Sequence, residues 1–126
     1  MLNIIPTELH LHRFSKILEI KYEDGASYNL SCEYLRVFSP SAEVQGHAPG
    51  QRVLQVGKED VNVEKIEMVG NYAICLHFDD GHNSGIYSWE YLHKLALNQA
   101  RNWNEYLTEL QNSGHKRKEQ LYSALP

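Results

Sequence analysis

Two segments of the chain hold most of the side chains that could bind or react. Residues 36–51 (RVFSPSAEVQGHAPGQ) combine small residues and two prolines with Glu43 and His47, and residues 46–50 within them have no core-forming pattern. Long loops of this kind are often functional or else simply mobile. Residues 79–84 (DDGHNS) place two carboxylates and His82 on a predicted hairpin tip. Such a group could hold a cation, although Asp-Gly is itself a turn signal. The two segments of interest are thus residues 36–51, the 36–51 loop, and the tip residues 80–84, the 80–84 hairpin.

Two other histidine patterns favour a structural interpretation. His77-Phe78-Asp79 matches the His-x-Asp pattern of non-haem iron oxygenases, with His115 as a conceivable third ligand. The barrel that holds such a site needs more strands than this chain can supply. His10 and His12 share one strand face, but a solvated edge strand explains them without a metal.

The remaining reactive residue types do not form a catalytic pattern. The chain lacks the GxxxxGK[ST] phosphate loop, a Ser/His/Asp order and paired catalytic carboxylates. Cys32 and Cys75 alone cannot make a disulfide framework or a four-thiolate cluster, and we expect both to be small buried hydrophobes. The sequence therefore predicts a protein that is not an enzyme and has no cofactor, apart from a weak affinity for a divalent metal.

Composition sets the class of molecule. The 126 residues are 42% hydrophobic and 22% charged, which is typical of one globular domain. A net charge of −4 argues against general nucleic-acid binding. No signal-peptide pattern is present, and no apolar run approaches the roughly 18 residues of a membrane span. We therefore expect a cytoplasmic protein that binds neither nucleic acid nor membrane.

An internal repeat supplies the elements that must position these residues. Residues 17–38 and 73–95 align at an offset of 56, which becomes 57 after one insertion. Each copy has an alternating strand, an Asp-Gly turn (Asp24 or Asp80) and a short return strand. A serine at an N-cap position and an acid in the first helical turn follow, Ser31 and Glu33 in the first copy. The sequence predicts two hairpin–helix units.

The rest of the chain completes an α+β domain. Residues 61–69 should pair with 72–78 across a turn, 9–11 should form a short edge strand, and 39–57 should be a long loop. The apolar stripe Ala100, Trp103, Leu107 and Leu110 predicts a helix over 99–112 that ends near Gly114. The fold class is a single compact α+β domain over 1–114, with antiparallel β hairpins, two short helices and a C-terminal helix. Residues 115–126 should be a basic, frayed tail.

Two stretches of the sequence, which include the 36–51 loop and the 80–84 hairpin, resemble a known family. Residues 33–51 (EYLRVFSPSAEVQGHAPGQ) and 69–92 (VGNYAICLHFDDGHNSGIYSWEYL) resemble bacterial stand-alone members of the gamma-butyrobetaine hydroxylase-like N-terminal domain family. The resemblance spans about residues 6–110. It implies a compact mixed α/β fold built on antiparallel strands, in a family largely without assigned function.

The resemblance also implies a zinc site that this chain should lack. In the related hydroxylases the domain holds zinc through three cysteines, which follow a Trp-Leu-Arg helix, and one histidine. The helix matches residues 34–36, the cysteine positions fall on Ser39, Ser41 and Val44, and the histidine falls on His82. Neutral hydroxyls and a valine cannot replace thiolates. The same correspondence brings the 36–51 loop to His82, which implies a polar patch with weak metal affinity through His47 and His82.

Three functional hypotheses remain open. The leading one is a non-catalytic protein-binding module that works through the 36–51 loop and the 80–84 hairpin. The family also resembles a domain fused to Mrp-type iron–sulfur carrier ATPases, which implies an accessory role toward such a carrier. The alternatives are a small metal- or ligand-binding protein using His47 and His82, and a partner in trans of a 2-oxoglutarate oxygenase. Oligomeric state stays open. The candidate binding residues are Arg36, Ser39, Ser41, Glu43, His47, Asp80 and His82.

Overall fold

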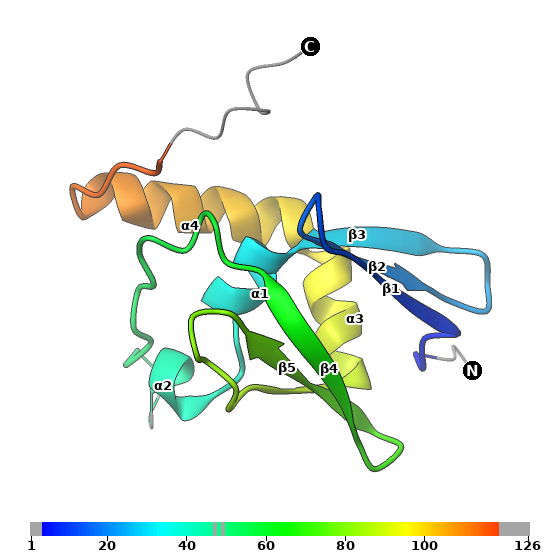
Figure 1. Ribbon diagram of the computed structural model, residues 1–126. Helices are drawn as coiled ribbons and strands as arrows, with labels where there is room; N and C mark the ends of the chain where they lie inside the picture. The colour runs from blue at the N-terminus through cyan, green and yellow to red at the C-terminus, as the bar shows by residue number, and fades with distance from the viewer. Residues whose placement is uncertain (1–3, 47, 49, 119–126) are drawn as a thin grey trace.

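Two three-stranded antiparallel sheets form the framework of the computed structural model, which describes residues 4–46, 48 and 50–118. Both sheets follow chain order, and all strand pairs are antiparallel. The first consists of β1 (Glu8–His12), β2 (Ile17–Lys21) and β3 (Ser27–Ser31), and the second of β4 (Val63–Val69), β5 (Ala73–Phe78) and β6 (Ile86–Ser88) (Figure 1). The predicted pairing of residues 61–69 with 72–78 is confirmed in β4 and β5.

The two predicted hairpin–helix units are also confirmed. Helix α1 (Cys32–Val37) follows β3 directly, and α3 (Trp89–Leu97) follows β6. The side chain of Ser31 accepts a hydrogen bond from the Tyr34 N–H, and Ser88 accepts one from the Tyr91 N–H. Each N-cap serine therefore starts its helix at the position that the sequence pattern predicts.

Helix α4 (Gln99–Asn112) has the predicted bounds but a different buried face. Tyr106 and Leu110 are buried, whereas Ala100, placed in the apolar stripe by its spacing, is exposed. At about 100° per residue, Ala100 is separated from Tyr106 by about 120° around the helix, and it lies outside the face that Tyr106 and Leu110 bury. The helix ends as expected, with Gly114 at φ +81° donating its N–H to the Gln111 carbonyl.

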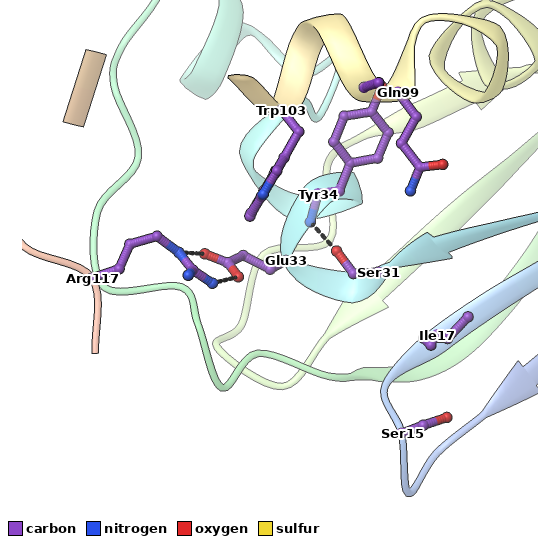
Figure 2. Close-up of a pocket in the computed structure, with 9 residues that line it drawn as sticks. Ser15, Ile17, Ser31, Glu33, Tyr34, Gln99, Trp103 and Arg117 are labelled. Carbon is purple, nitrogen blue, oxygen red and sulfur yellow. Dashed lines mark hydrogen bonds and ion pairs between the residues drawn. The ribbon is translucent and has the colours of Figure 1, made fainter. Parts of the chain in front are cut away.

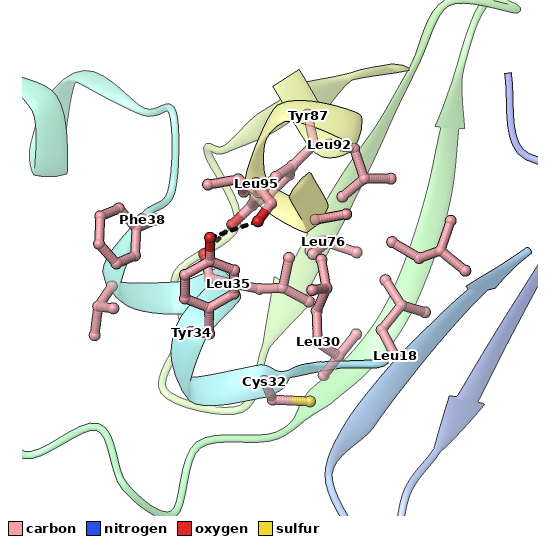
Figure 3. Packing of buried hydrophobic residues seen from close by; sticks show 14 of the residues in the cluster. Leu18, Leu30, Cys32, Tyr34, Leu35, Phe38, Leu76, Tyr87, Leu92 and Leu95 are labelled. Carbon is pink, nitrogen blue, oxygen red and sulfur yellow. Dashed lines mark hydrogen bonds between the residues drawn. The ribbon is translucent and has the colours of Figure 1, made fainter. Parts of the chain in front are cut away.

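The core lies between the sheets and the helices, and buried tyrosines tie its parts together (Figure 3). Leu18 and Leu76 of the two sheets are fully buried. Hydroxyls of Tyr34, Tyr87 and Tyr106 donate to the backbone carbonyls of Leu95, Leu35 and Gln55, respectively. These bonds link α1 to α3, β6 to α1, and α4 to the long loop. The chain is thus a single compact α+β domain.

Both cysteines are buried free thiols, as predicted. Burial is the main cause that raises the pKa of the Cys32 and Cys75 thiols. A thiol with a raised pKa is a poor nucleophile and a poor metal ligand, so these residues act as small hydrophobes.

The long loop between the two units is ordered by contacts with the domain. It contains the one-turn helix α2 (Ala42–Gln45), whose Val44 is 1% exposed. The Val53 N–H donates to the Val44 carbonyl at 2.7 Å. The Arg52 guanidinium lies 4.5 Å from the centre of the Phe38 ring. The loop is therefore held at several points along its length.

Near the C-terminus, residues 115–118 lie against the domain. Arg117 forms an ion pair with Glu33, and Lys118 forms one with Asp60. The remainder of the predicted tail, residues 119–126, is outside the described residues. Among the described residues, no helix has both the length and the apolar character needed to cross a membrane.

Candidate functional site

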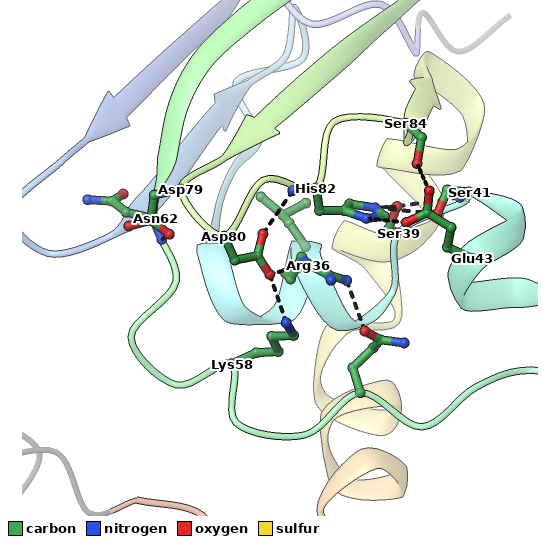
Figure 4. Close-up of polar contacts among 12 residues, drawn as sticks. Arg36, Ser39, Ser41, Glu43, Lys58, Asn62, Asp79, Asp80, His82 and Ser84 are labelled. Carbon is green, nitrogen blue, oxygen red and sulfur yellow. Dashed lines mark hydrogen bonds and ion pairs between the residues drawn. The ribbon is translucent and has the colours of Figure 1, made fainter.

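The 36–51 loop and the 80–84 hairpin meet at the buried side chain of His82 (Figure 4). This side chain is 2% exposed. Its Nε2 lies 2.8 Å from Ser39 Oγ and 3.3 Å from Ser41 Oγ, and its Nδ1 lies 3.2 Å from a Glu43 carboxylate oxygen. Ser84 donates to the other Glu43 oxygen at 3.2 Å. The hairpin histidine is thus the anchor for three residues of the loop.

The hydrogen-bond partners of His82 determine which of its ring nitrogens carries the hydrogen. A carboxylate only accepts hydrogen bonds, so Nδ1 facing Glu43 carries the hydrogen, and Nε2 accepts from the serine hydroxyls. Burial, and next the positive charge of Arg36, lower the pKa of His82, although Glu43 and Asp80 act in the opposite direction. The imidazole is therefore neutral near pH 7, and its hydrogen bonds connect the hairpin to the loop.

A second cluster in the same region links α1 to the hairpin through charge. Arg36 Nε donates to Asp80 Oδ2 at 2.9 Å, and Lys58 Nζ donates to the same oxygen at 2.8 Å. Arg36 also donates to the Gln55 side chain at 3.1 Å. Burial alone would raise the pKa of Asp80, but the hydrogen bonds from Lys58, the His82 N–H and Arg36 outweigh it and lower that pKa to about 2. Asp80 is therefore ionised at neutral pH.

The structure brings together six of the seven predicted binding residues, namely Arg36, Ser39, Ser41, Glu43, Asp80 and His82. The seventh, His47, lies outside the described residues. Lys58, Gln55 and Ser84 belong to the same network but were not predicted. No local pattern marks Lys58 or Gln55, whereas the Asp-x-His-x-Ser spacing of the hairpin does point to Ser84.

The residues at the family's zinc position do not fit zinc. Ser39 and Ser41 present neutral hydroxyls, Val44 is a buried aliphatic side chain, and both ring nitrogens of His82 are already hydrogen-bonded. Across the described part of the chain, no three histidine, cysteine, aspartate or glutamate side chains are grouped so that they could hold a metal ion. The two serine hydroxyls instead hydrogen-bond to His82, the residue at the position of the family's zinc-binding histidine.

In space, Ser39, His82 and Glu43 are hydrogen-bonded one to the next as in a hydrolase triad, an arrangement that their order along the chain does not show. The serine nevertheless cannot act as a nucleophile. Ser39 is 0% exposed. A Cβ added to Gly85 would overlap Ser39 Oγ, so backbone already fills the space in front of the hydroxyl. A substrate carbonyl needs that space to reach a catalytic serine. The three residues therefore join loop to hairpin.

The other histidine patterns are accounted for by pairs on exposed strand faces. His77 lies 2.9 Å from a Glu67 carboxylate oxygen across β4 and β5. His10 and His12 lie 2.8 Å and 3.0 Å from Glu8 and Glu19 carboxylate oxygens, respectively. These contacts agree with the structural interpretation that the sequence favours for all three histidines.

Acidification below pH 6.5 is expected to destabilise the protein through His82. Its folded-state pKa is lowered from the ordinary 6.5, so the unfolded chain takes up the proton first as the pH falls. Stability is then complete above about pH 6.5 and declines below it, by at most about 1.4 kcal/mol per pH unit for one proton. Urea unfolding between about pH 5.5 and 7.5 measures this slope.

His82→Gln provides the comparison, because every other histidine is common to both proteins. The variant should be less stable at pH 7 and should show a flatter pH dependence in this window. Parallel slopes for the two proteins would show that the buried imidazole is not the source of the effect.

Comparison with known proteins identifies the family of the chain. Residues 9–93 match the family described as gamma-butyrobetaine hydroxylase-like, N-terminal. No curated protein matches the chain.

Solved structures extend the likeness to nearly the whole chain. One NMR solution structure is 45% identical with a TM-score of 0.79, covering 97% of this chain and 98% of that one. Another is 47% identical with a TM-score of 0.78, covering 96% of this chain and 90% of that one. A crystal structure of a DUF971-family protein of unknown function from Acidithiobacillus ferrooxidans is 39% identical with a TM-score of 0.62, covering 74% of this chain and 93% of that one. The chain belongs to the gamma-butyrobetaine hydroxylase-like, N-terminal family.

Proposed function

We propose that this chain is a non-catalytic protein-binding module whose binding surface consists of the 36–51 loop and the 80–84 hairpin. The observation that carries the proposal is the engagement of both ring nitrogens of buried His82 by Ser39, Ser41 and Glu43. A loop fixed in this way loses little conformational entropy when a partner binds, so it is pre-organised for recognition.

The surface offers a partner both charge and apolar area. The Glu43 side chain is 70% exposed although its carboxylate is fixed by His82 and Ser84. Val53, just beyond the loop, is 52% exposed, and its N–H donates to the carbonyl of Val44, the residue next to Glu43. An oriented acid near an exposed aliphatic side chain suits a protein surface with a complementary basic and apolar patch.

The partner that the family resemblance suggests is an iron–sulfur carrier ATPase, with a 2-oxoglutarate oxygenase as the alternative. Two buried thiols of raised pKa make the chain itself a poor holder of a cluster, so its role would be to contact the carrier or its client. Metal binding through His47 and His82 is a weaker alternative, because both His82 nitrogens already have partners.

Affinity capture with the full chain tests this function. We expect the wild type to retain a carrier ATPase or an oxygenase from native lysate, identified by mass spectrometry. The Glu43→Lys/Val53→Asp variant should lose about 90% or more of it, since a reversed charge and a buried carboxylate each cost about 1–3 kcal/mol at an interface.

The matched control changes the same residue types on β4. Glu64→Lys/Met68→Asp reverses one exposed acid and removes one exposed apolar side chain outside the loop. It should retain the partner at the wild-type level. Equal loss from both variants, or equal retention by both, would contradict the proposed surface.

A further inference from the structure

A cavity of about 500 Å³ lies between α1, the start of α4 and the turn that joins β1 to β2 (Figure 2). Its lining includes Glu33 and Tyr34 of α1, Gln99 and Trp103 of α4, and Ser15 of the turn. None of these residues belongs to the surface proposed above, so the cavity requires an explanation of its own.

Arg117 already occupies the charged end of this cavity. Its Nε donates to Glu33 Oε2 at 3.0 Å and its Nη2 donates to Oε1, so the guanidinium binds the carboxylate with two parallel hydrogen bonds. The guanidinium carbon also lies 5.3 Å from the centre of the Trp103 ring. Glu33 is only 6% exposed, which fixes its carboxylate for this geometry. A buried carboxylate beside an aromatic face is a suitable receptor for an arginine side chain.

Apart from Arg117, the segment of residues 115–118 is held by two backbone hydrogen bonds, from the His115 N–H to the Leu110 carbonyl and from the Lys118 N–H to Glu59, and by one ion pair. Residues 115–118 form neither helix nor strand. Two further hollows, of about 490 and 260 Å³, border Arg117 and its neighbours His115 and Lys116. The Lys118–Asp60 ion pair is exposed on both sides, at 67% and 57% of the side chains. Exposed pairs of this kind contribute little, so the segment can leave the cavity without loss of core packing.

The turn between β1 and β2, which contributes Ser15 to the cavity, also carries an apolar side chain that does not pack in the core. Phe14 is 100% exposed and precedes Ser15 in the turn between β1 and β2. The neighbouring turn residues are anchored, since Arg13 and Lys16 donate to the carbonyls of Glu64 and Asp60. An exposed aromatic on a fixed turn is available to a partner that reaches the cavity.

We propose that this cavity binds an arginine side chain from a basic segment of a partner protein, and that Arg117 occupies the same site in the free chain. A partner must then displace Arg117, which lowers its apparent affinity. Lysine should bind less tightly than arginine, because an ammonium group cannot make both hydrogen bonds to Glu33 in parallel. Glu59, which accepts from the Lys118 backbone N–H, and Asp60 extend the receptor for a second basic residue.

A peptide offered in trans tests the site. The probe is a blocked tetrapeptide with the sequence of residues 115–118, His-Lys-Arg-Lys, titrated into full-length protein and followed by NMR. Arg117→Ala should bind it about tenfold or more tightly than the wild type does, because the tethered competitor is removed. The shifts should include the Glu33 backbone N–H and the Trp103 indole N–H. Arg117→Lys, which keeps a cation but loses the two-pronged contact, should show an intermediate affinity.

A peptide with citrulline in place of arginine is the matched control. Citrulline keeps the shape of the side chain and removes its charge, so its binding to Arg117→Ala should be lost. Equal affinity of the wild type and the two Arg117 variants would overturn the proposal, as would absence of binding to all three. Equal affinity for the arginine and citrulline peptides would also overturn it. If Arg117→Ala folds poorly, the arginine and citrulline peptides are compared on Arg117→Lys, which should still bind only the arginine peptide and bind it more tightly than the wild type does.

Discussion

Asp80→Ala is expected to lower the free energy of unfolding by about 2–3 kcal/mol, because it removes the charged hydrogen-bond partner of the buried Arg36 guanidinium. Asp80 accepts from Arg36 Nε at 2.9 Å, from Lys58 Nζ at 2.8 Å and from the His82 N–H at 3.1 Å. The Arg36 side chain is only 8% exposed, so its guanidinium cannot recover hydration when the carboxylate is lost. Urea denaturation of wild type and variant at pH 7 measures the difference.

The internal repeat supplies a matched control. Asp24 occupies the equivalent turn of the first unit and accepts from the Ala26 N–H at 2.9 Å, as Asp80 does from His82. Asp24→Ala should therefore cost only the turn hydrogen bond, about 1 kcal/mol or less. The difference between the two variants isolates the Arg36 and Lys58 contacts. Equal costs for Asp24→Ala and Asp80→Ala would show that these contacts do not stabilise the fold.

The difference in stability between the wild type and Asp80→Ala should depend on pH, because only the wild type has the Asp80 carboxyl group. The pKa of Asp80 is lowered from 3.8 to about 2, so its contribution is complete above about pH 4 and is lost as the pH falls toward 2. The stabilities of wild type and variant should accordingly converge in that acidic range. This window lies below the one in which His82 titrates, so the two effects can be measured separately.

Local signals account for the parts of the fold that the sequence predicts well. The serine N-caps, the Asp-Gly turns and the bounds of α4 each depend on a few neighbouring residues, and the repeat provides the N-cap and turn signals twice. The buried face of α4 depends on what packs against it. Tyr106 is buried because its hydroxyl reaches the Gln55 carbonyl in the long loop, a contact between residues 51 positions apart. Spacing within the helix carries no information about that loop, so Ala100 was placed wrongly.

In the candidate site, too, the features that depend on contacts between distant segments could not be predicted from local sequence. That the 36–51 loop meets His82 follows from the family resemblance, not from spacing. Lys58 contacts Asp80 across 22 residues that include β4 and β5, and no pattern in the sequence selects it over another lysine. Glu33 fits the expected acid in a first helical turn, yet the structure shows it buried beneath Arg117, 84 residues away. Ion pairs between distant segments depend on the assembled fold and are the part that local reasoning misses.

Gly85→Ala is the second substitution with a large expected effect, a loss of about 2 kcal/mol typical of overpacking. Gly85 does not have a positive φ, so the effect does not come from backbone strain. A methyl group there would overlap Ser39 Oγ and lie 3.3 Å from the Tyr87 ring and 3.4 Å from Pro40 Cδ. Ser39 can escape the overlap only by turning away from His82, which breaks the 2.8 Å hydrogen bond at the centre of the site.

A double-mutant cycle separates this cause from general crowding. Ser39→Ala alone should cost about 1 kcal/mol, because it removes one hydrogen bond to His82. In the Ser39→Ala background the overlapping oxygen is absent, so Gly85→Ala should cost about 1 kcal/mol less than it does in the wild type. Chemical denaturation of the four proteins gives the coupling energy. Strictly additive costs would mean that the methyl group acts through Tyr87 and Pro40, and that the Ser39–His82 contact does not depend on a glycine at position 85.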